Sequence, residues 1–547
     1  MSQVKSSIQD NENTSLFNNP SNLINEQKNP EDYIEKRYQI RQSEFTSEEN
    51  FNKIKEDALI SELNFGQNER IKMFNKRRIF QKKKYDNLNS LKNKIMIPLE
   101  LYEECDKIIP DYNSINDNLN NFKSDDISVK YKALVSLKKI LLKSQELINE
   151  EEQKEIQIKI INNIINDCIL LLNSSYPEFQ VESLICLNEM IMISEDYCCT
   201  IIAKGGLSIL IKNFDSNISE IQENSIITIR NLIQQSPDNF KQFVQEKGYE
   251  KLINKLTNCQ NPSILIQCVN TISSFIKIKN IELNYNTLIK PLIYPLIRTF
   301  SLIKDNENFI SESTWLLGII SDKYIKSRDE IIQSGIISVI INLIENSNSK
   351  YIKLCSLRII GNMISGNANQ TQEILNLGVL NVLKKTLFHE KSSIRKETAW
   401  ILSNICSGTQ KQIECIIDNG FLELFNKCLK NDIIDVKNEI YWAITNLTIV
   451  NNFNYMKKII DEGIVEIICS LLKEKNTKIL CISLEALGNL LIFGKKNSVN
   501  GRNFIVEKIE NCGAEDDLVN LQYHSLDIVY QKALYILENY FDTEPIF

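Results

Sequence analysis

Histidine, proline and glycine are scarce in this sequence, and the short motifs of common catalytic and metal sites are missing from it. Its 547 residues include two histidines, ten prolines and sixteen glycines. The histidines have neither metal-ligand nor nucleophile–base spacing, the fourteen cysteines include no C-x-x-C pair, and no glycine-rich phosphate loop occurs. We therefore expect no enzymatic activity, no cofactor and no metal site, and few interruptions of helical structure.

Long apolar runs are also missing. The best candidate, LIKPLIYPLIRTFSLI, is interrupted by charged residues and prolines, so no segment is predicted to cross a membrane. The N-terminal stretch MSQVKSSIQDNENTSLFNNP lacks the apolar region of a secretory signal. The cysteines are scattered through apolar helical runs, which favours reduced core thiols over disulfides or zinc ligands. These features predict a protein of the cytosol or the nucleus.

A regular period runs through the chain. The segment ETAWILSNI (397–405) recurs as EIYWAITNL (439–447), as ESTWLLGII (312–320) and, more distantly, as CSLRIIGNM (355–363). Positions equivalent to the tryptophan are separated by 42, 43, 45, 43, 42, 42 and 43 residues. A fixed period of this length with helical patterning is typical of armadillo and HEAT repeats. The tryptophan-equivalent positions are Ile185, Ile227, Asn270, Trp315, Arg358, Trp400, Trp442 and Glu485.

Each repeat is predicted to consist of two helices that are joined by a turn. In six repeats a glycine follows the tryptophan-equivalent position by 20 or 21 residues, and it suits a helix C-cap or a tight turn because glycine tolerates positive φ. An amphipathic helix and a polar loop then lead to the longer helix. No unit can bury its apolar face alone, so neighbouring units must stack into an all-α solenoid. The six glycines are Gly206, Gly248, Gly335, Gly378, Gly420 and Gly463.

All three tryptophans, Trp315, Trp400 and Trp442, occupy the same phase of the repeat. An acid often stands three residues before this position and an asparagine four residues after it, so that acid, indole and amide share one helix face. An asparagine amide can pair with the backbone of an extended peptide, and parallel indoles can hold a lysine or arginine stem. This pattern favours a groove for extended basic peptides, with the indoles facing solvent. The alternative is a core tryptophan between exposed asparagine and glutamate.

The chain from about residue 100 to residue 541 resembles importin-α, the adaptor that recognises nuclear localisation signals. The resemblance rests on SLRIIGNMISGNANQTQ, IRKETAWILSNICSGT and NEIYWAITNL, and on the final VEKIENCGAEDDLVNLQYHSLDIVYQKALYILENYF, which is similar to the family's last repeat. It implies an armadillo-repeat superhelical solenoid of about ten repeats with a flexible basic N-terminal arm. It also implies two signal-binding stretches of the groove, a major site on the second to fourth repeats and a minor site on the sixth to eighth.

The pattern of the minor site is intact. By resemblance, Trp400 and Trp442 would sandwich a lysine or arginine stem. Thr371, Asn404 and the Gly366 carbonyl would receive a lysine head group, and the asparagines would hold the peptide backbone. The residues carried over to the minor site are Arg358, Asn362, Gly366, Thr371, Glu397, Trp400, Ser403, Asn404, Glu439, Trp442 and Asn446.

The pattern of the major site is eroded. Its tryptophan positions hold Ile185, Ile227 and Asn270, none of which can form an indole wall. We therefore expect this protein to rely on its minor site or to have a changed cargo preference. The peptide-binding residues retained at the major site and at the centre of the groove are Asn231, Glu312 and Trp315.

A basic segment precedes the repeats. Residues 70–94 contain ten basic residues and one acid, so the rest of the chain has a net charge of −16. Such an arm would find an acidic solenoid intramolecularly, although a nucleic-acid patch or a nuclear targeting signal would have a similar composition. In importin-α this place is held by the importin-β-binding segment. The resemblance implies that role for Arg70, Lys76, Arg77, Arg78, Lys82, Lys83 and Lys84.

The leading interpretation is a nuclear import adaptor that shuttles between cytoplasm and nucleus, with cargo in the groove and importin-β on the arm. The resemblance also implies an export receptor with Ran at the C-terminal repeats, and no direct binding of nucleic acid or membranes. The alternative is an armadillo scaffold that binds extended basic peptides without importin-β. The predicted organisation is a disordered extension (1–63), an importin-β-binding-like segment (64–97), the solenoid (98–541) and a short tail (542–547).

Overall fold

The computed structural model describes residues 97–541 apart from 146, 148, 278–282 and 499–501. Within this part of the chain the residues form helices joined by turns and loops, and none of them forms a β-strand. The predicted N-terminal extension, nearly all of the basic segment and the C-terminal tail lie outside the described residues.

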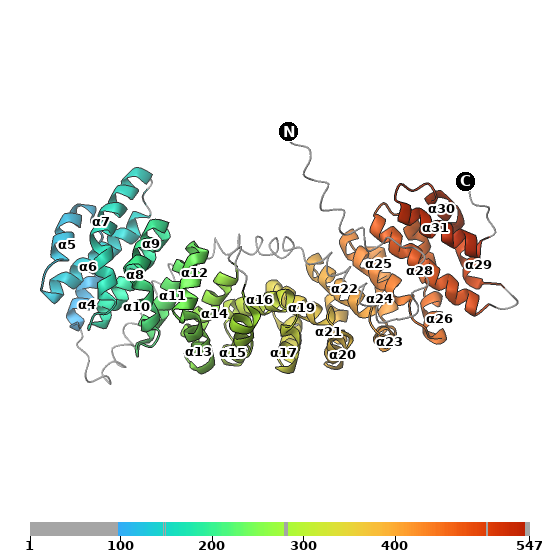
Figure 1. Ribbon diagram of the computed structural model, residues 1–547, viewed down its shortest axis with the longest axis horizontal. Coiled ribbons are helices and arrows are strands. Elements are labelled where there is room, and N and C mark those ends of the chain that lie inside the picture. Colours follow the sequence, from blue (N-terminus) through green and yellow to red (C-terminus); the bar gives the residue numbers. More distant parts are fainter. Residues whose placement is uncertain (1–96, 146, 148, 278–282, 499–501, 542–547) are drawn as a thin grey trace. The chain divides into compact units, whose positions relative to one another are not determined.

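The chain divides into two compact units, which we call the N-terminal unit (described residues 97–316) and the C-terminal unit (described residues 317–541). The point of division falls within helix α16 (Glu307–Lys323). The helices of each unit follow one another in the order in which they are labelled in Figure 1.

The N-terminal unit begins with short helices and continues with repeats that each end in a long helix. Its other helices are α4 (Leu99–Asp106), η2 (Tyr112–Ser114), α5 (Ile115–Asn121), α6 (Ile127–Ser144), α7 (Glu150–Leu171), α8 (Pro177–Ile193), α9 (Glu195–Ala203), α10 (Gly206–Asn213), α11 (Ser219–Gln235), α12 (Pro237–Gln245), α13 (Gly248–Asn258), α14 (Pro262–Ile276), η3 (Tyr285–Ile289) and α15 (Lys290–Leu302).

The C-terminal unit repeats the same pattern. Its helices after α16 are α17 (Ser327–Gln333), α18 (Ile337–Asn346), α19 (Lys350–Ile364), α20 (Ala368–Asn376), α21 (Val379–Thr386), α22 (Ser392–Cys406), α23 (Gln410–Asp418), α24 (Phe421–Asn431), α25 (Ile434–Leu447), α26 (Phe453–Asp461), α27 (Ile464–Ser470), η4 (Leu471–Lys473), α28 (Thr477–Lys496), α29 (Phe504–Asn511), α30 (Ala514–Leu521) and α31 (Asp527–Tyr540).

The repeat has three helices, so the predicted two-helix unit is wrong. A short helix such as α20 or α23 lies between each long helix and the recurring glycine, in a segment that we had assigned to the turn. Both short helices begin with a capping box, in which Asn367 pairs with Gln370 and Thr409 pairs with Gln412. In a capping box the N-cap side chain accepts a hydrogen bond from a backbone N–H of the first turn, and the glutamine side chain accepts one from the N-cap N–H; together these two bonds define the start of a helix. Three helices per unit are therefore encoded locally.

The recurring glycine marks the turn before the middle helix of the repeat. At Gly206 and Gly248 the predicted position is wrong by one residue, because Gly205 and Lys247 carry the positive φ angles of 75° and 61°. Gly248 instead begins α13 beside the Phe243 ring, where a Cβ atom would lie 2.0 Å from Cε2. The prediction is confirmed at the remaining four positions, Gly335, Gly378, Gly420 and Gly463.

The long helices of successive repeats pack directly on one another. In the N-terminal unit α8 contacts α11, and α11 contacts α14; in the C-terminal unit α19, α22, α25 and α28 form the same kind of row and α31 ends it. The residue two positions after the tryptophan-equivalent position is fully buried in each of these rows, as Ile229, Ile360, Leu402 and Ile444 show. Burial of such side chains contributes about 1.5–3 kcal/mol each. Stacking of repeats therefore builds a core that no repeat has alone.

Helix α28 is long and apolar enough, by length and composition, to cross a membrane. Residues buried inside the protein make up 56% of its most apolar window. It also packs between α25 and α31. These contacts are those of a core helix. A buried core helix can be as long and as apolar as a membrane-spanning helix, so length and composition do not distinguish the two.

Candidate functional site

The acid, indole and amide positions of the C-terminal unit lie on neighbouring long helices. Helix α22 carries Glu397, Trp400 and Asn404 at successive turns, and α25 carries their counterparts Glu439, Trp442 and Asn446. Because α22 packs on both α19 and α25, the structure brings these residues together with Arg358 and Asn362 of α19. We call this set the indole ladder. It contains Arg358, Asn362, Glu397, Trp400, Asn404, Glu439, Trp442 and Asn446.

The ring of Trp400 lies against the preceding repeat. A Cβ atom on Gly361 of α19 would lie 2.0 Å from Cζ3 of the indole, so a glycine is required for this approach. The guanidinium carbon of Arg358 lies 5.2 Å from the ring centroid, within cation–π distance. Trp442 packs on the following repeat, against Leu471 and Ile479.

The prediction that the indoles face solvent is wrong in this structure. Trp315, Trp400 and Trp442 are 4%, 3% and 8% exposed. The physical reason is visible at Trp400, where the neighbouring helix supplies both a glycine that admits the ring and a cation that covers it. The alternative of a tryptophan flanked by exposed polar groups is not met either, because Glu397 and Asn404 are themselves buried. The ladder is a buried polar–aromatic layer.

Arg358 of α19 and Glu397 of α22 form a bidentate ion pair within the ladder. Nε of Arg358 lies 2.8 Å from Oε1 of Glu397, and Nη2 donates to Oε2 at 3.1 Å. The two side chains are 10% and 5% exposed. Burial raises the pKa of Glu397 to about 7, although Arg358 opposes the rise; the nearby Glu439 adds to it. A carboxyl whose charge costs this much in the protein interior gains from any additional cation brought close to it.

Most ladder asparagines connect consecutive long helices. Nδ2 of Asn362 donates to the Gly318 carbonyl at 3.2 Å and to Oγ of Ser321 at 2.9 Å, and Nδ2 of Asn446 donates to the Ser403 carbonyl at 3.0 Å. In each of these bonds the side-chain amide is the donor and a group of the preceding repeat is the acceptor. The asparagines therefore also bind one repeat to the next, which the sequence pattern did not show.

Asn404 is the exception among the described residues. Neither its Nδ2 nor its Oδ1 has a hydrogen-bond partner, yet the residue is only 1% exposed. A buried polar group left without a partner costs about 1–3 kcal/mol. Its place one turn beyond Trp400, on the same face, puts a free donor and a free acceptor beside the indole. This is the arrangement expected where a ligand supplies the missing partners.

Of the three remaining minor-site residues, Ser403 lies in α22, Thr371 in the short helix α20, and Gly366 in the turn between α19 and α20. Oγ1 of the buried Thr371 donates to the Ile364 carbonyl at 2.9 Å, and Oγ of Ser403 donates to the Trp400 carbonyl at 2.8 Å. A Cβ atom on Gly366 would lie 1.7 Å from Oε1 of Gln370. The hydroxyl hydrogens of Thr371 and Ser403 are therefore both donated to the protein backbone.

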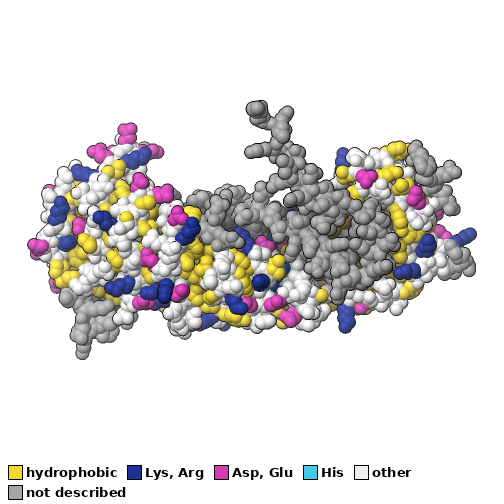
Figure 2. Space-filling view, viewed as in Figure 1, with side chains coloured by type: hydrophobic (Ala, Val, Ile, Leu, Met, Phe, Trp, Pro, Cys, Tyr) yellow, Lys and Arg dark blue, Asp and Glu magenta, His cyan; other side chains and the backbone are white. Residues whose placement is uncertain are grey.

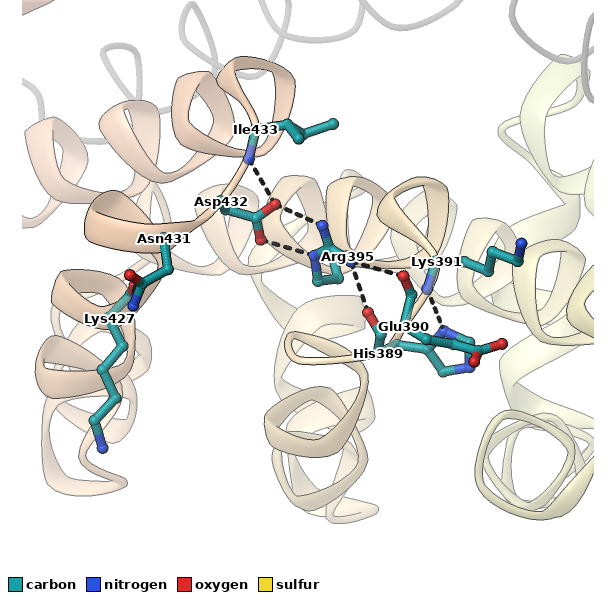
Figure 3. A network of polar contacts seen from close by, with 8 residues as sticks. All are labelled: His389, Glu390, Lys391, Arg395, Lys427, Asn431, Asp432 and Ile433. Atoms are coloured by element: carbon teal, nitrogen blue, oxygen red, sulfur yellow. Dashed lines mark hydrogen bonds and ion pairs between the residues drawn. The ribbon is translucent and has the colours of Figure 1, made fainter.

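Arg395 of α22 holds the two indole-bearing helices in register (Figure 3). Its Nε and Nη2 donate to the two carboxylate oxygens of Asp432 at 2.8 and 2.7 Å, and its Nη1 donates to the His389 carbonyl at 2.8 Å. Although burial by itself raises the pKa of Asp432, the hydrogen bonds from Arg395 and from the Ile433 N–H hold it below the ordinary value. Asp432 lies two residues before the first residue of α25, so this bidentate pair fixes the start of α25 against α22.

The N-terminal unit presents a different face. Its tryptophan-equivalent positions Ile185, Ile227 and Asn270 are partly buried and supply no indole. Nδ2 of Asn231 donates to Oδ1 of Asn188 at 3.2 Å. Trp315 is the single indole of this unit in the sequence of residues 58–316.

Two basic residues of the N-terminal unit were not predicted as part of the site. Lys277 lies against Trp315 and Glu312, and Arg230 lies against Gln267. Helical spacing could have identified both residues. Lys277 follows the tryptophan-equivalent Asn270 by two helical turns, and Arg230 follows the tryptophan-equivalent Ile227 by one turn, so each lies on the same helix face as that position.

Comparison with known proteins identifies the repeat. Residues 367–407 and 457–492 match the armadillo/beta-catenin-like repeat, and residues 503–546 match the atypical Arm repeat. A solved structure of an engineered protein has the same fold, with a TM-score of 0.60 and 21% identity, over 78% of this chain and 98% of that chain. The predicted all-α armadillo-repeat solenoid is confirmed.

Curated relatives extend the similarity over most of the chain. Importin subunit alpha-7 of Arabidopsis thaliana is 30% identical over 415 residues, which cover 73% of this chain and 76% of the relative. Importin subunit alpha-1b of Oryza sativa subsp. japonica is 28% identical over 427 residues, which cover 77% of this chain and 78% of the relative.

Proposed function

Because the chain belongs to the importin-α family of armadillo-repeat proteins, we propose that its indole ladder binds lysine- and arginine-rich signals as the cargo site of a nuclear import adaptor. The proposal assigns cargo to the C-terminal unit, importin-β to the segment 64–97, and an export receptor with Ran to the last repeats. It makes the protein a factor that shuttles between cytoplasm and nucleus.

The observation that carries this proposal is the unpaired amide of Asn404 beside Trp400. An extended peptide has a free N–H and a free C=O at each residue, so one peptide unit can satisfy both atoms of this amide. A lysine stem of that peptide would lie between the indoles of Trp400 and Trp442, and Glu439 would attract its head group. The nearly complete burial of both rings means that part of the binding energy is spent on opening the slot.

Replacing Asn404 by alanine tests this observation. We expect the affinity for a lysine-rich peptide to fall about tenfold, because one polar anchor of the peptide backbone is lost. The free energy of unfolding should stay the same or rise by about 1 kcal/mol, because an unsatisfied buried amide is removed. Titration calorimetry and chemical denaturation measure the two quantities.

Asn489→Ala is the matched control for this test. Asn489 occupies the same phase of the repeat in α28, and its Nδ2 donates to Oγ1 of Thr448 at 3.2 Å. Its replacement should lower stability by about 1 kcal/mol and leave the peptide affinity unchanged. Equal losses of stability in the two variants, without an effect of Asn404→Ala on binding, would show that Asn404 has only a structural role.

The alternative function is an armadillo scaffold that binds basic peptides without importin-β. Replacing Lys76, Arg77 and Arg78 together by alanine in the full chain separates the two. We expect capture of purified importin-β to fall at least about tenfold, because several charge-assisted contacts are lost, while peptide binding to the ladder persists. Replacing Lys123, Lys143 and Lys154 by alanine removes the same charge outside the segment and is the control. Absence of importin-β capture by the unmodified chain would favour the scaffold.

A further inference from the structure

A lysine of the chain itself fills the slot beside the only indole of the N-terminal unit. Nζ of Lys277, at the end of α14, lies 4.3 Å from the ring centroid of Trp315 and 2.5 Å from Oε1 of Glu312. The Lys277 and Glu312 side chains are 29% and 28% exposed, so the slot is at the surface and already contains a cation. Indole, acid and ammonium group have the geometry that a peptide lysine would adopt.

A second cation lies one repeat earlier. Nη1 of Arg230 in α11 donates to Oε1 of Gln267 in α14 at 3.0 Å. Gln267 occupies the acid position of its repeat, three residues before Asn270, so an uncharged acceptor meets the guanidinium there. Burial lowers the pKa of Arg230, and the nearby Glu312 carboxylate opposes this lowering. Both basic residues therefore use acceptors that a basic peptide would need.

The same arrangement recurs in the C-terminal unit. Arg358 lies over Trp400 and pairs with Glu397, just as Lys277 lies over Trp315 and pairs with Glu312. In both cases the preceding repeat has no tryptophan at the equivalent position, since that position is Asn270 or Arg358 itself. A slot with one indole wall is thus filled from within the chain. The slot proposed above for a peptide would instead have the indoles of Trp400 and Trp442 as its two walls.

We propose that Lys277, aided by Arg230, is a specificity-determining residue that closes the N-terminal unit to basic peptides by occupying the Glu312–Trp315 slot. A tethered lysine competes at a high effective concentration, so a peptide lysine must displace it to bind. On the face of this unit seen in Figure 2, basic and acidic side chains are interspersed. The inference rests on the proposed function, because it concerns which stretch of the groove accepts the same ligand.

Lys277→Met tests the inference, because methionine removes the charge and keeps a flexible apolar side chain. The chain has three tryptophans, so Trp400→Phe/Trp442→Phe leaves Trp315 as its sole indole and makes its fluorescence a direct reporter of this slot. In that background we expect hexalysine to change the Trp315 emission in a saturable way, at about tenfold lower concentration after Lys277→Met. Arg230→Ser should add to the gain.

Lys241→Met is the matched control, because Lys241 is an exposed lysine of the same unit that pairs with Asp238 instead of Glu312. It should leave the hexalysine response unchanged. If Lys277→Met and Lys241→Met respond alike while both variants keep their melting temperature, the inference is overturned. Hexalysine binding by the unmodified chain, measured separately, tests the ladder of the C-terminal unit. If the unmodified chain does not bind hexalysine, the proposed function is overturned, whereas the Trp315 measurement still reports separately on the Lys277 slot.

Discussion

Replacing both Trp400 and Trp442 by alanine is expected to lower the affinity for a lysine-rich peptide at least about hundredfold. A central aromatic residue of a binding site typically contributes about 2–4 kcal/mol, and these two indoles form both walls of the proposed slot. Calorimetric titration of the full chain with hexalysine, compared with the unmodified protein, measures the effect. An unchanged affinity would remove the ladder of the C-terminal unit as the binding site.

The buried rings make folding the main complication of this test. Each indole is less than a tenth exposed, and truncation of a buried tryptophan costs about 3–5 kcal/mol of stability. Trp400→Phe/Trp442→Phe keeps most of the packing and should still weaken binding about tenfold, because phenylalanine is a smaller and poorer cation–π partner. Trp315→Ala makes the same chemical change in the other unit, and the affinity of the ladder should then stay within about twofold.

The repeat, and the positions of the ladder residues within it, could be predicted from the sequence because both are periodic. One glutamate, one tryptophan and one asparagine at successive turns of the long helix recur after 42 residues in α22 and α25, and helical geometry alone places them on one face. The same periodicity cannot show whether that face is open. Burial of Trp400 depends on Gly361 and Arg358, which belong to the preceding repeat. Contacts between repeats have no local signature in the sequence.

Other differences between the predicted and the observed helices have causes that can be identified in the local sequence. The short helices α20 and α23 were not predicted although their capping boxes stand in the sequence, because the whole segment between the long helix and the recurring glycine was interpreted as a turn. The turn before α13 was placed at Gly248, whereas Lys247 has the positive φ, because a residue type was matched instead of a backbone position. The importin-β-binding role of the basic segment stays a prediction, since the segment lies outside the described residues.

Gly361→Ala is expected to have the second-largest effect and to reverse the usual sign of a glycine replacement. In a helix interior, alanine is more favourable than glycine by about 1 kcal/mol. At Gly361 of α19, however, the new methyl group would lie 2.0 Å from Cζ3 of Trp400, so the indole must move. Overpacking of this kind costs about 1–3 kcal/mol, and a displaced ring should also weaken peptide binding about tenfold or more.

Gly488→Ala is the matched control for this change. Gly488 stands at the same phase of the repeat in α28, three residues after the tryptophan-equivalent Glu485, and nothing lies within 4 Å of its added Cβ atom. Alanine there should raise the free energy of unfolding by about 0.5–1 kcal/mol. Combining Gly361→Ala with Trp400→Ala should cost less than the two changes measured separately, because the small side chain at position 400 removes the clash. If Gly361→Ala instead stabilises the protein as Gly488→Ala does, Trp400 does not lie against α19, and the geometry of the proposed slot has to be abandoned.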